Sequence, residues 1–155
     1  MTVAEALRAA SIDPRDARLL LAAATGLSEA GVVGFPERPV SADAESRFLE
    51  HCQRRRKGEP IAYIRGFKEW LSLRVMTDSR ALIPRPETEQ LVAYLVEEGT
   101  RDGVPSRIID LGTGSGAIAL AMARLQAAEV LLDQHGRHAP AWMALHSRNA
   151  DLAGG

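Results

Sequence analysis

The sequence predicts an α/β protein in which a small N-terminal helical bundle is followed by a β-hairpin linker and by the start of a parallel sheet. Two contrasts in the pattern of apolar residues indicate this order. Residues 1–57 show short amphipathic stretches at helical spacing, whereas residues 106–155 alternate strand-like apolar runs with helical ones. Aromatic and β-branched side chains are frequent between these two parts. We therefore expect three segments, over 1–57, 58–85 and 86–155.

The expected helical bundle carries clear start and stop signals. Residues 3–10 form a short amphipathic stretch. Typical N-cap residues precede three further helices: Asp13 before Pro14, Ser28, and Ser41. Gly26 is expected to end the helix that begins at Pro14, because glycine readily adopts the left-handed conformation found at helix C-termini. The apolar stripes of these helices are predicted to form the core of the bundle.

Charge and cysteine content narrow the classes of function. The formal net charge is −1, so the overall electrostatics gives no reason to expect binding to nucleic acid or to an anionic membrane. The basic run 54–57 is interpreted as a solvated helix end, with a binding patch as the alternative. Cys52 is the single cysteine, which excludes an internal disulfide and fits a reducing compartment. Because neither a secretion signal nor a membrane span is indicated, we expect a cytoplasmic protein.

A linker is predicted after the Gly-Glu-Pro break that follows the bundle. Residues 61–82 are expected to form a β-hairpin or small sheet, with turn-forming side chains at 77–79. Two prolines then enclose Arg85. The second of them, Pro86, is predicted to begin a helix that ends at about Glu98.

The α/β part contains the most informative motif. The apolar run 107–109 is followed by Asp-Leu-Gly-Thr-Gly-Ser-Gly over 110–116 and then by a helical apolar stretch. A strand, a glycine turn and a helix in this order present free backbone N–H groups and a helix N-terminus to a ligand. Residues 129–132 and 140–152 are predicted to add a parallel strand and a helix. Two strands do not make a stable doubly wound domain, so the chain is expected to be a fragment of an incomplete sheet.

Asp110 bears on the kind of ligand. The pattern Gly-x-Gly-x-x-Ala over 112–117 is the looser form of the dinucleotide fingerprint. A carboxylate so close to the turn disfavours a pyrophosphate and favours a cationic group, such as the sulfonium and ammonium of S-adenosylmethionine. The residues therefore favour S-adenosylmethionine over a nicotinamide cofactor, and either of them over a glycine turn that binds nothing.

A second carboxylate is expected at the end of the next strand, because the vicinal ribose hydroxyls of an adenosine are hydrogen-bond donors. Asp133 is the acidic residue in that place. His135 and His138 follow it and raise the question of a metal. No cysteine or carboxylate stands at ligand spacing from them, so a solvated loop is the favoured interpretation and no metal site is predicted.

Three segments in a fixed order resemble the PrmC/HemK family of protein-(glutamine-N5) methyltransferases, which act on peptide-chain release factors. They are Gly-Glu-Pro-Ile-Ala-Tyr-Ile-Arg-Gly over 58–66, Ile-Pro-Arg-Pro-Glu-Thr-Glu over 83–89 and the glycine motif over 110–116. The resemblance extends over about residues 1–126. It implies a helical N-terminal domain, a β-hairpin linker and a Rossmann-like class I methyltransferase domain, of which this chain would carry the first part.

The resemblance also implies roles for individual residues. The cofactor-binding residues would be Asp110, Gly112, Thr113, Gly114, Ser115, Gly116 and, for the ribose, Asp133. The residues that cover the cofactor and the glutamine entrance would be Arg85, Pro86, Glu87 and Thr88. The implied cofactor is S-adenosyl-L-methionine. The implied partner is a release factor, recognised through residues 1–57, while nucleic acid, membranes and a particular oligomeric state are not implied.

Two features depart from the family pattern. The family's ribose carboxylate stands about three residues before a proline, whereas Asp133 stands seven residues before Pro140 and Arg137 occupies the nearer place. The catalytic signature Asn-Pro-Pro-Tyr is absent from these 155 residues, so no catalytic residue is assigned. The alternative functions are a non-catalytic binding module formed by a truncated product and, less favoured, a nicotinamide-binding fragment.

Overall fold

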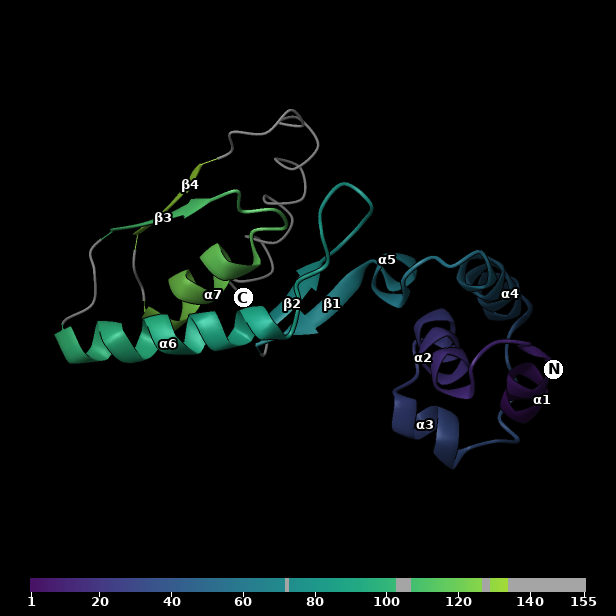
Figure 1. The fold of residues 1–155 in the computed structure, drawn as a ribbon. Helices are drawn as coiled ribbons and strands as arrows, with labels where there is room; N and C mark the ends of the chain where they lie inside the picture. The colour runs from purple at the N-terminus through teal and green to yellow at the C-terminus, as the bar shows by residue number, and fades with distance from the viewer. Residues whose placement is uncertain (72, 103–106, 127–128, 134–155) are drawn as a thin grey trace. The chain divides into compact units, whose positions relative to one another are not determined.

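The computed structural model describes residues 1–71, 73–102, 107–126 and 129–133 (Figure 1). The chain divides into two compact units, residues 1–65 and residues 66–155, which we call unit 1 and unit 2. The division follows a short helix over 61–65, while the expected segments 1–57, 58–85 and 86–155 stay predictions.

Unit 1 is a helical bundle, as its apolar stripes predict. Its helices are α1 (Val3–Ala9), α2 (Pro14–Thr25), α3 (Glu29–Gly34), α4 (Ala42–Arg56) and α5 (Ile61–Arg65). Helix α2 contacts each of the other four. Leu20 and Leu21 of α2 are fully buried, and they share one core with Phe48 and Cys52 of α4. Burial of these apolar side chains is the main force that holds the bundle together.

The helices of unit 1 begin and end at the capping residues that the sequence indicates. Gly26 ends α2 with a left-handed φ of 74°. The side chains that cap helix N-termini accept backbone N–H groups: Asp13 from Arg15 at 2.9 Å, Ser28 from Gly31 at 3.0 Å, and Ser41 from Ala44 at 3.2 Å. Thr2 and Glu5 form a reciprocal capping box on α1, which the sequence analysis did not identify. These local bonds satisfy N–H groups that have no partner within a helix.

The basic run at the end of α4 has a structural role. Arg54 binds Glu59, at 2.6 and 2.8 Å, and the carbonyl of Tyr63 in α5. Arg55 Nε lies 2.7 Å from Asp16 Oδ2 in α2, and Arg56 donates to the carbonyl of Ala10, after α1, at 3.1 Å. Each of these three arginines therefore ties α4 to another part of the bundle. The run is still a helix end that meets solvent, since Arg54 and Arg55 are partly exposed and Arg56 is exposed, but the prediction did not include its bonds to the rest of the bundle.

The segment expected to be a hairpin over 61–82 is extended only from residue 67. Residues 61–65 form α5 instead, because the carbonyl of Pro60 accepts the N–H groups of Tyr63 and Ile64 at 3.0 and 3.1 Å. The side chain of Ile64 is buried in the core of unit 1. β-branched residues suggest a strand, but a tertiary contact determines the local conformation here.

Unit 2 begins with an antiparallel hairpin of β1 (Phe67–Trp70) and β2 (Leu73–Met76). Trp70 pairs with Leu73 and Lys68 with Val75, so these four side chains lie on one face. Trp70, Leu73 and Val75 are buried there. The turn chemistry expected at 77–79 lies after β2, where Asp78 accepts the N–H of Arg80 at 3.0 Å.

The rest of unit 2 contains α6 (Glu87–Asp102), β3 (Arg107–Leu111), α7 (Ala117–Gln126) and β4 (Glu129–Asp133). Strands β3 and β4 pair in parallel, and α7 connects them, which is the order predicted for 107–132. Helix α6 extends beyond the predicted end at Glu98. The predicted helix over 140–152 lies outside the described residues. A second apolar core joins the hairpin, α6 and α7 through these buried residues: Trp70, Leu73, Val75, Val92, Ala117, Ala121 and Met122.

Candidate functional site

The predicted ligand loop connects β3 to α7, and its backbone has the unusual conformation that its glycines permit. Gly112, Gly114 and Gly116 have φ values of 70°, 57° and 79°. These values lie in the left-handed region that other residues enter at a cost. The N–H of Gly116 donates to the carbonyl of Thr113 at 2.9 Å, which closes a turn immediately before α7.

Space beside the loop is open. A Cβ placed on Gly112 would meet no heavy atom within 4 Å, and one placed on Gly114 would lie 3.9 Å from the nearest, the carbonyl oxygen of Gly112. Glycine is therefore required at these two positions for φ and not for lack of room within the protein. The open space leaves the backbone of the loop accessible to a ligand.

Asp110 is placed at the end of β3 with a defined side-chain orientation. Its exposed fraction is 9%, and its Oδ2 accepts the hydroxyl of Thr113 at 2.7 Å. A carboxylate can accept about four hydrogen bonds, so this one contact leaves acceptor capacity. Thr113 and Ser115 are also buried. The structure thus brings these three predicted polar residues together with the glycine turn.

Asp133, the predicted ribose ligand, is the last residue of β4. In the parallel register it pairs with Leu111, the residue after Asp110. The carboxyl ends of parallel strands lie at the same sheet edge, where α/β proteins bind ligands. The backbone therefore places Asp133 on the neighbouring strand at the edge that carries Asp110. His135, Arg137, His138 and Pro140 lie outside the described residues.

The segment 83–89 leads into α6 and is held by its backbone. Arg85, Pro86 and Glu87 are exposed, whereas Thr88 is half-buried. The carbonyl of Arg85 accepts the N–H of Thr88 at 3.1 Å and the indole Nε1–H of Trp70 at 3.2 Å. The exposed side chains of Arg85, Pro86 and Glu87 thus project from a backbone that is held by hydrogen bonds from Trp70 and Thr88.

Trp70 is the residue of this site that the sequence analysis missed, because it was treated only as a strand residue of the linker. Its exposed fraction is 1%. It belongs to the same apolar cluster as Ala117 and Ala121, on the first two turns of α7. The segment 83–89 and the helix that follows the glycine loop are therefore both attached to this cluster. An aromatic residue whose N–H must find a partner when buried is the signal that could have identified it.

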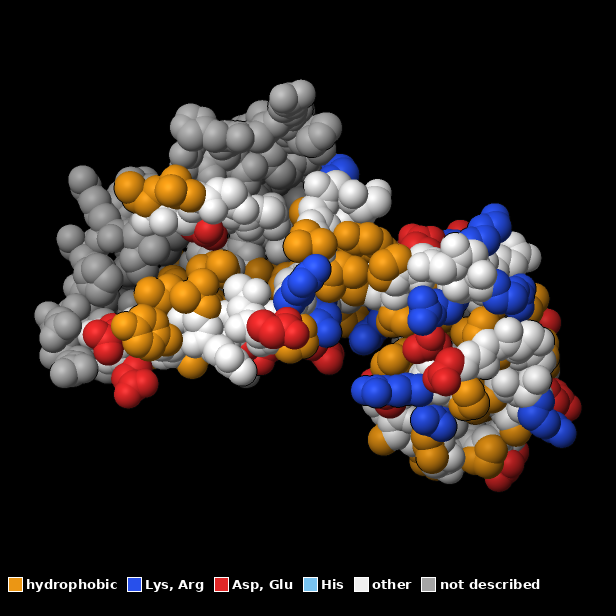
Figure 2. Space-filling model, viewed as in Figure 1, with side chains coloured by type: hydrophobic (Ala, Val, Ile, Leu, Met, Phe, Trp, Pro, Cys, Tyr) orange, Lys and Arg blue, Asp and Glu red, His pale blue; other side chains and the backbone are white. Residues whose placement is uncertain are grey.

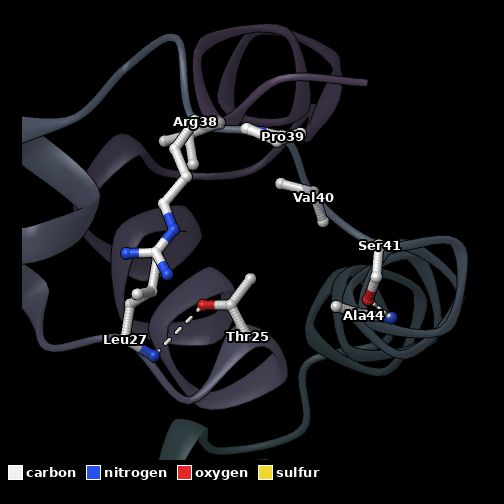
Figure 3. Close-up of a pocket in the computed structure, with 8 residues that line it drawn as sticks. Thr25, Leu27, Arg38, Pro39, Val40, Ser41 and Ala44 are labelled. Carbon is white, nitrogen blue, oxygen red and sulfur yellow. Dashed lines mark hydrogen bonds between the residues drawn. The ribbon is translucent and has the colours of Figure 1, made fainter.

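Unit 1 has a hollow of its own, of about 160 Å³, between the C-terminal end of α2, the start of α1 and the residues that lead into α4 (Figure 3). Arg38 lines it together with two hydroxyl side chains that are engaged within the bundle. The hydroxyl of Thr25 donates to the carbonyl of Leu21 at 2.7 Å and accepts the N–H of Leu27 at 3.3 Å, and Ser41 caps α4. Positive and negative side chains are mixed over the visible face of unit 1, without a patch of one sign (Figure 2). The hollow is thus a gap between helices and carries no clear site chemistry.

Neither a cluster of metal ligands nor a membrane-spanning helix occurs in the part of the chain that the structure describes. Within it, no group of three or more His, Cys, Asp and Glu side chains could hold a metal ion. No helix among the same residues has the length and apolar character needed to cross a membrane.

The first comparison with known proteins concerns the N-terminal helical bundle. A helical bundle that leads into a β-hairpin, followed by a glycine loop with a buried aspartate, is the architecture described above, and residues 2–66 match the family model of the PrmC N-terminal domain. The predicted resemblance to the PrmC/HemK family is therefore confirmed, and it extends beyond this domain in individual relatives.

Those relatives share one name, "Release factor glutamine methyltransferase". The protein from Burkholderia pseudomallei is 45% identical over 123 residues, which are 79% of this chain and 42% of that protein. The one from Coxiella burnetii is 43% identical over 122 residues, 78% of this chain and 44% of the relative. The one from Deinococcus radiodurans is 38% identical over 140 residues, 90% of this chain and 49% of the relative. The chain thus spans less than half the length of these curated relatives.

Proposed function

We propose that this chain forms the release-factor-binding and cofactor-binding parts of an S-adenosylmethionine-dependent methyltransferase that modifies a glutamine side-chain amide in peptide-chain release factors. The observation that carries the proposal is the loop after β3, where a buried, oriented Asp110 stands beside a glycine turn with open space. The relatives' shared name supports the release factor as substrate. Translation termination in the cytoplasm is the setting that this substrate implies.

The loop suits a cationic ligand better than an anionic one. S-adenosylmethionine, when bound, supplies a methyl group on a positively charged sulfur. Asp110 would attract the cationic methionine end, because opposite charges interact strongly where water is partly excluded. The backbone of Gly112 and Gly114 would lie against the ligand without an intervening Cβ. A pyrophosphate at the same place would be repelled by the Asp110 carboxylate, which is the argument against a nicotinamide cofactor.

Other parts of the site belong to the same proposal. Asp133 would accept hydrogen bonds from the ribose hydroxyls, since β4 places it one strand from Asp110. Arg85, Pro86, Glu87 and Thr88 would cover the cofactor and line the glutamine entrance. Residues 1–57 would recognise the release factor. No catalytic residue is proposed among the residues of this chain.

The proposed sheet would be the start of a Rossmann-like methyltransferase domain. Ile109 and Leu111 support this, because they are exposed at 62% and 72% on β3, where alternation separates them from Asp110. Apolar strand residues of a parallel sheet are normally covered on both faces. Further methyltransferase residues would therefore pack over Ile109 and Leu111.

A cofactor-binding measurement tests the proposal on the chain itself. Titration calorimetry with S-adenosylmethionine is expected to show micromolar binding, and Asp110→Asn is expected to weaken it at least tenfold. NAD at the same concentration is not expected to compete. Absence of S-adenosylmethionine binding, or effective competition by NAD, would contradict the proposed cofactor.

Activity requires a separate experiment. The 155-residue chain and the full-length protein from the same gene are each incubated with a release factor and S-adenosylmethionine, and the release factor is analysed by mass spectrometry. A gain of one methyl group on a glutamine with the full-length protein supports the proposed substrate, and unmodified release factor contradicts it.

A further inference from the structure

Trp70 occupies an unusual place for an indole, because it is almost completely buried and yet uses its one polar atom outside its own element. Its exposed fraction is 1%, and its Nε1–H donates to the carbonyl of Arg85, 15 residues along the chain, at 3.2 Å. A buried indole N–H needs an acceptor, since an unpaired one costs about 1–3 kcal/mol. The bond therefore fixes the position of Arg85 relative to the hairpin.

The acceptor of this bond, the carbonyl of Arg85, has a second donor. The carbonyl of Arg85 also accepts the N–H of Thr88, at 3.1 Å, which begins α6. Arg85 itself is exposed, so without the indole its carbonyl would keep the bond from Thr88 and could accept water in place of the indole N–H. Two donors on one carbonyl hold the Arg85–Pro86 backbone between the hairpin and α6. The hairpin lies beside the N-terminal end of α6 (Figure 1).

The ring of Trp70 belongs to an apolar cluster that extends to the start of α7, the helix after the glycine loop. It shares this cluster with Val92 of α6 and with Ala117 and Ala121 of α7. Ala117 directly follows Gly116, the last glycine of the loop. A side chain that bonds one segment and shares a closely packed cluster with the start of another element couples the positions of the two, because buried side chains are closely packed.

We infer that Trp70 is a positioning residue, which fixes the segment 83–89 relative to the cluster that includes the start of α7, so that the segment can cover a bound cofactor. The inference rests on the proposed function, in which Arg85, Pro86, Glu87 and Thr88 cover S-adenosylmethionine. It adds a residue outside both motifs to the site. Trp70 itself is not inferred to contact the cofactor or the glutamine.

The test removes the N–H in two ways, of which only the first keeps the size of the ring. Trp70 is replaced in the full 155-residue chain by 3-benzothienylalanine, in which sulfur takes the place of the indole N–H, and separately by phenylalanine. Val75→Ala is the matched control, because Val75 is also 1% exposed in the same cluster but its side chain has no hydrogen-bonding atom. Hydrogen–deuterium exchange of Thr88 and Glu89 is measured without cofactor, and the Kd of S-adenosylmethionine is measured by calorimetry.

Both Trp70 variants are expected to speed exchange at Thr88 and Glu89 at least threefold and to raise the Kd about fivefold, which corresponds to about 1 kcal/mol. Val75→Ala is expected to change neither, at a temperature where all variants are folded. Unchanged exchange in the benzothienyl variant overturns the inference. An equal rise in Kd for Val75→Ala overturns it too, because general loss of packing would then explain the effect. A wild-type chain that binds no S-adenosylmethionine contradicts the proposed function instead, and the exchange measurement then decides alone whether Trp70 holds the segment.

Discussion

Replacing Gly112 by alanine is expected to destabilise unit 2 through backbone strain alone. The φ of Gly112 is 70°, and a Cβ there would meet no heavy atom within 4 Å. Steric overlap with neighbours therefore contributes nothing, and the remaining cost is that of a left-handed alanine, roughly 1–2 kcal/mol. With a urea m-value of 1–2 kcal/mol/M, the unfolding midpoint should fall by about 1 M.

The two tryptophans make this effect separable from unit 1. Both lie beyond residue 65, so tryptophan fluorescence follows the unfolding of unit 2, whereas far-UV circular dichroism follows the helices of both units. Gly34→Ala is the matched control, because a Cβ at Gly34 also meets nothing within 4 Å but its φ is not in the left-handed region. That variant is expected to keep the fluorescence midpoint and to leave the helices unchanged or slightly more stable.

Gly112→Ala also tests the proposed cofactor site. If the conformation of the loop is needed for binding, this variant should bind S-adenosylmethionine more weakly in the absence of urea, where the chain is folded. A fluorescence midpoint equal to that of the wild type would refute the strain argument, because it would mean that residue 112 does not keep its left-handed conformation in the folded protein.

Three further predictions concern unit 1. Burial lowers the pKa of His51 in the folded chain, so on acidification His51 is protonated in the unfolded chain before it is protonated in the folded one. The folded chain is therefore expected to keep its full stability above about pH 6.5 and to lose stability as the pH falls below that value. Circular dichroism melts from pH 7.5 to 5.5 should show this loss, and His51→Gln should reduce it. Burial also raises the pKa of the Cys52 thiol, so a thiol reagent should react slowly with the native chain and rapidly in urea, and fast native labelling would contradict the packing. A double-mutant cycle on Arg55→Ala and Asp16→Ala should give a coupling of about 0.5–1 kcal/mol for their partly exposed ion pair, whereas additive losses would show that the pair contributes nothing.

Much of the fold could be predicted because its signals are local. Asp13 and Ser41 cap helices within three residues of themselves, and Gly26 ends α2 through its own φ. The glycine loop is equally local, since Asp110 and Thr113, which are bonded to each other, are three residues apart. Such features depend on backbone geometry and on neighbours in the sequence, so they can be recognised without knowledge of distant contacts.

The errors have the opposite origin. Residues 61–65 were expected to be extended, but Ile64 finds a place in the core of unit 1 and the segment becomes helical. The arginines of 54–56 were interpreted through the helix end alone, whereas Arg55 meets Asp16, 39 residues earlier in the chain. In both cases the deciding partner is remote in sequence, and no periodicity or spacing identifies it.

The sequence by itself therefore determined the helical bundle, the glycine loop with Asp110 and the resemblance to the PrmC/HemK family, because each of these is built from short stretches whose signals are local. Only the tertiary structure decided that Arg54, Arg55 and Arg56 hold the bundle together and that Trp70 bonds the carbonyl of Arg85. The physical reason is packing. The buried indole N–H of Trp70 must find an acceptor, whereas the partly exposed arginines bond to acceptors that other elements bring within reach, so both depend on how the elements pack.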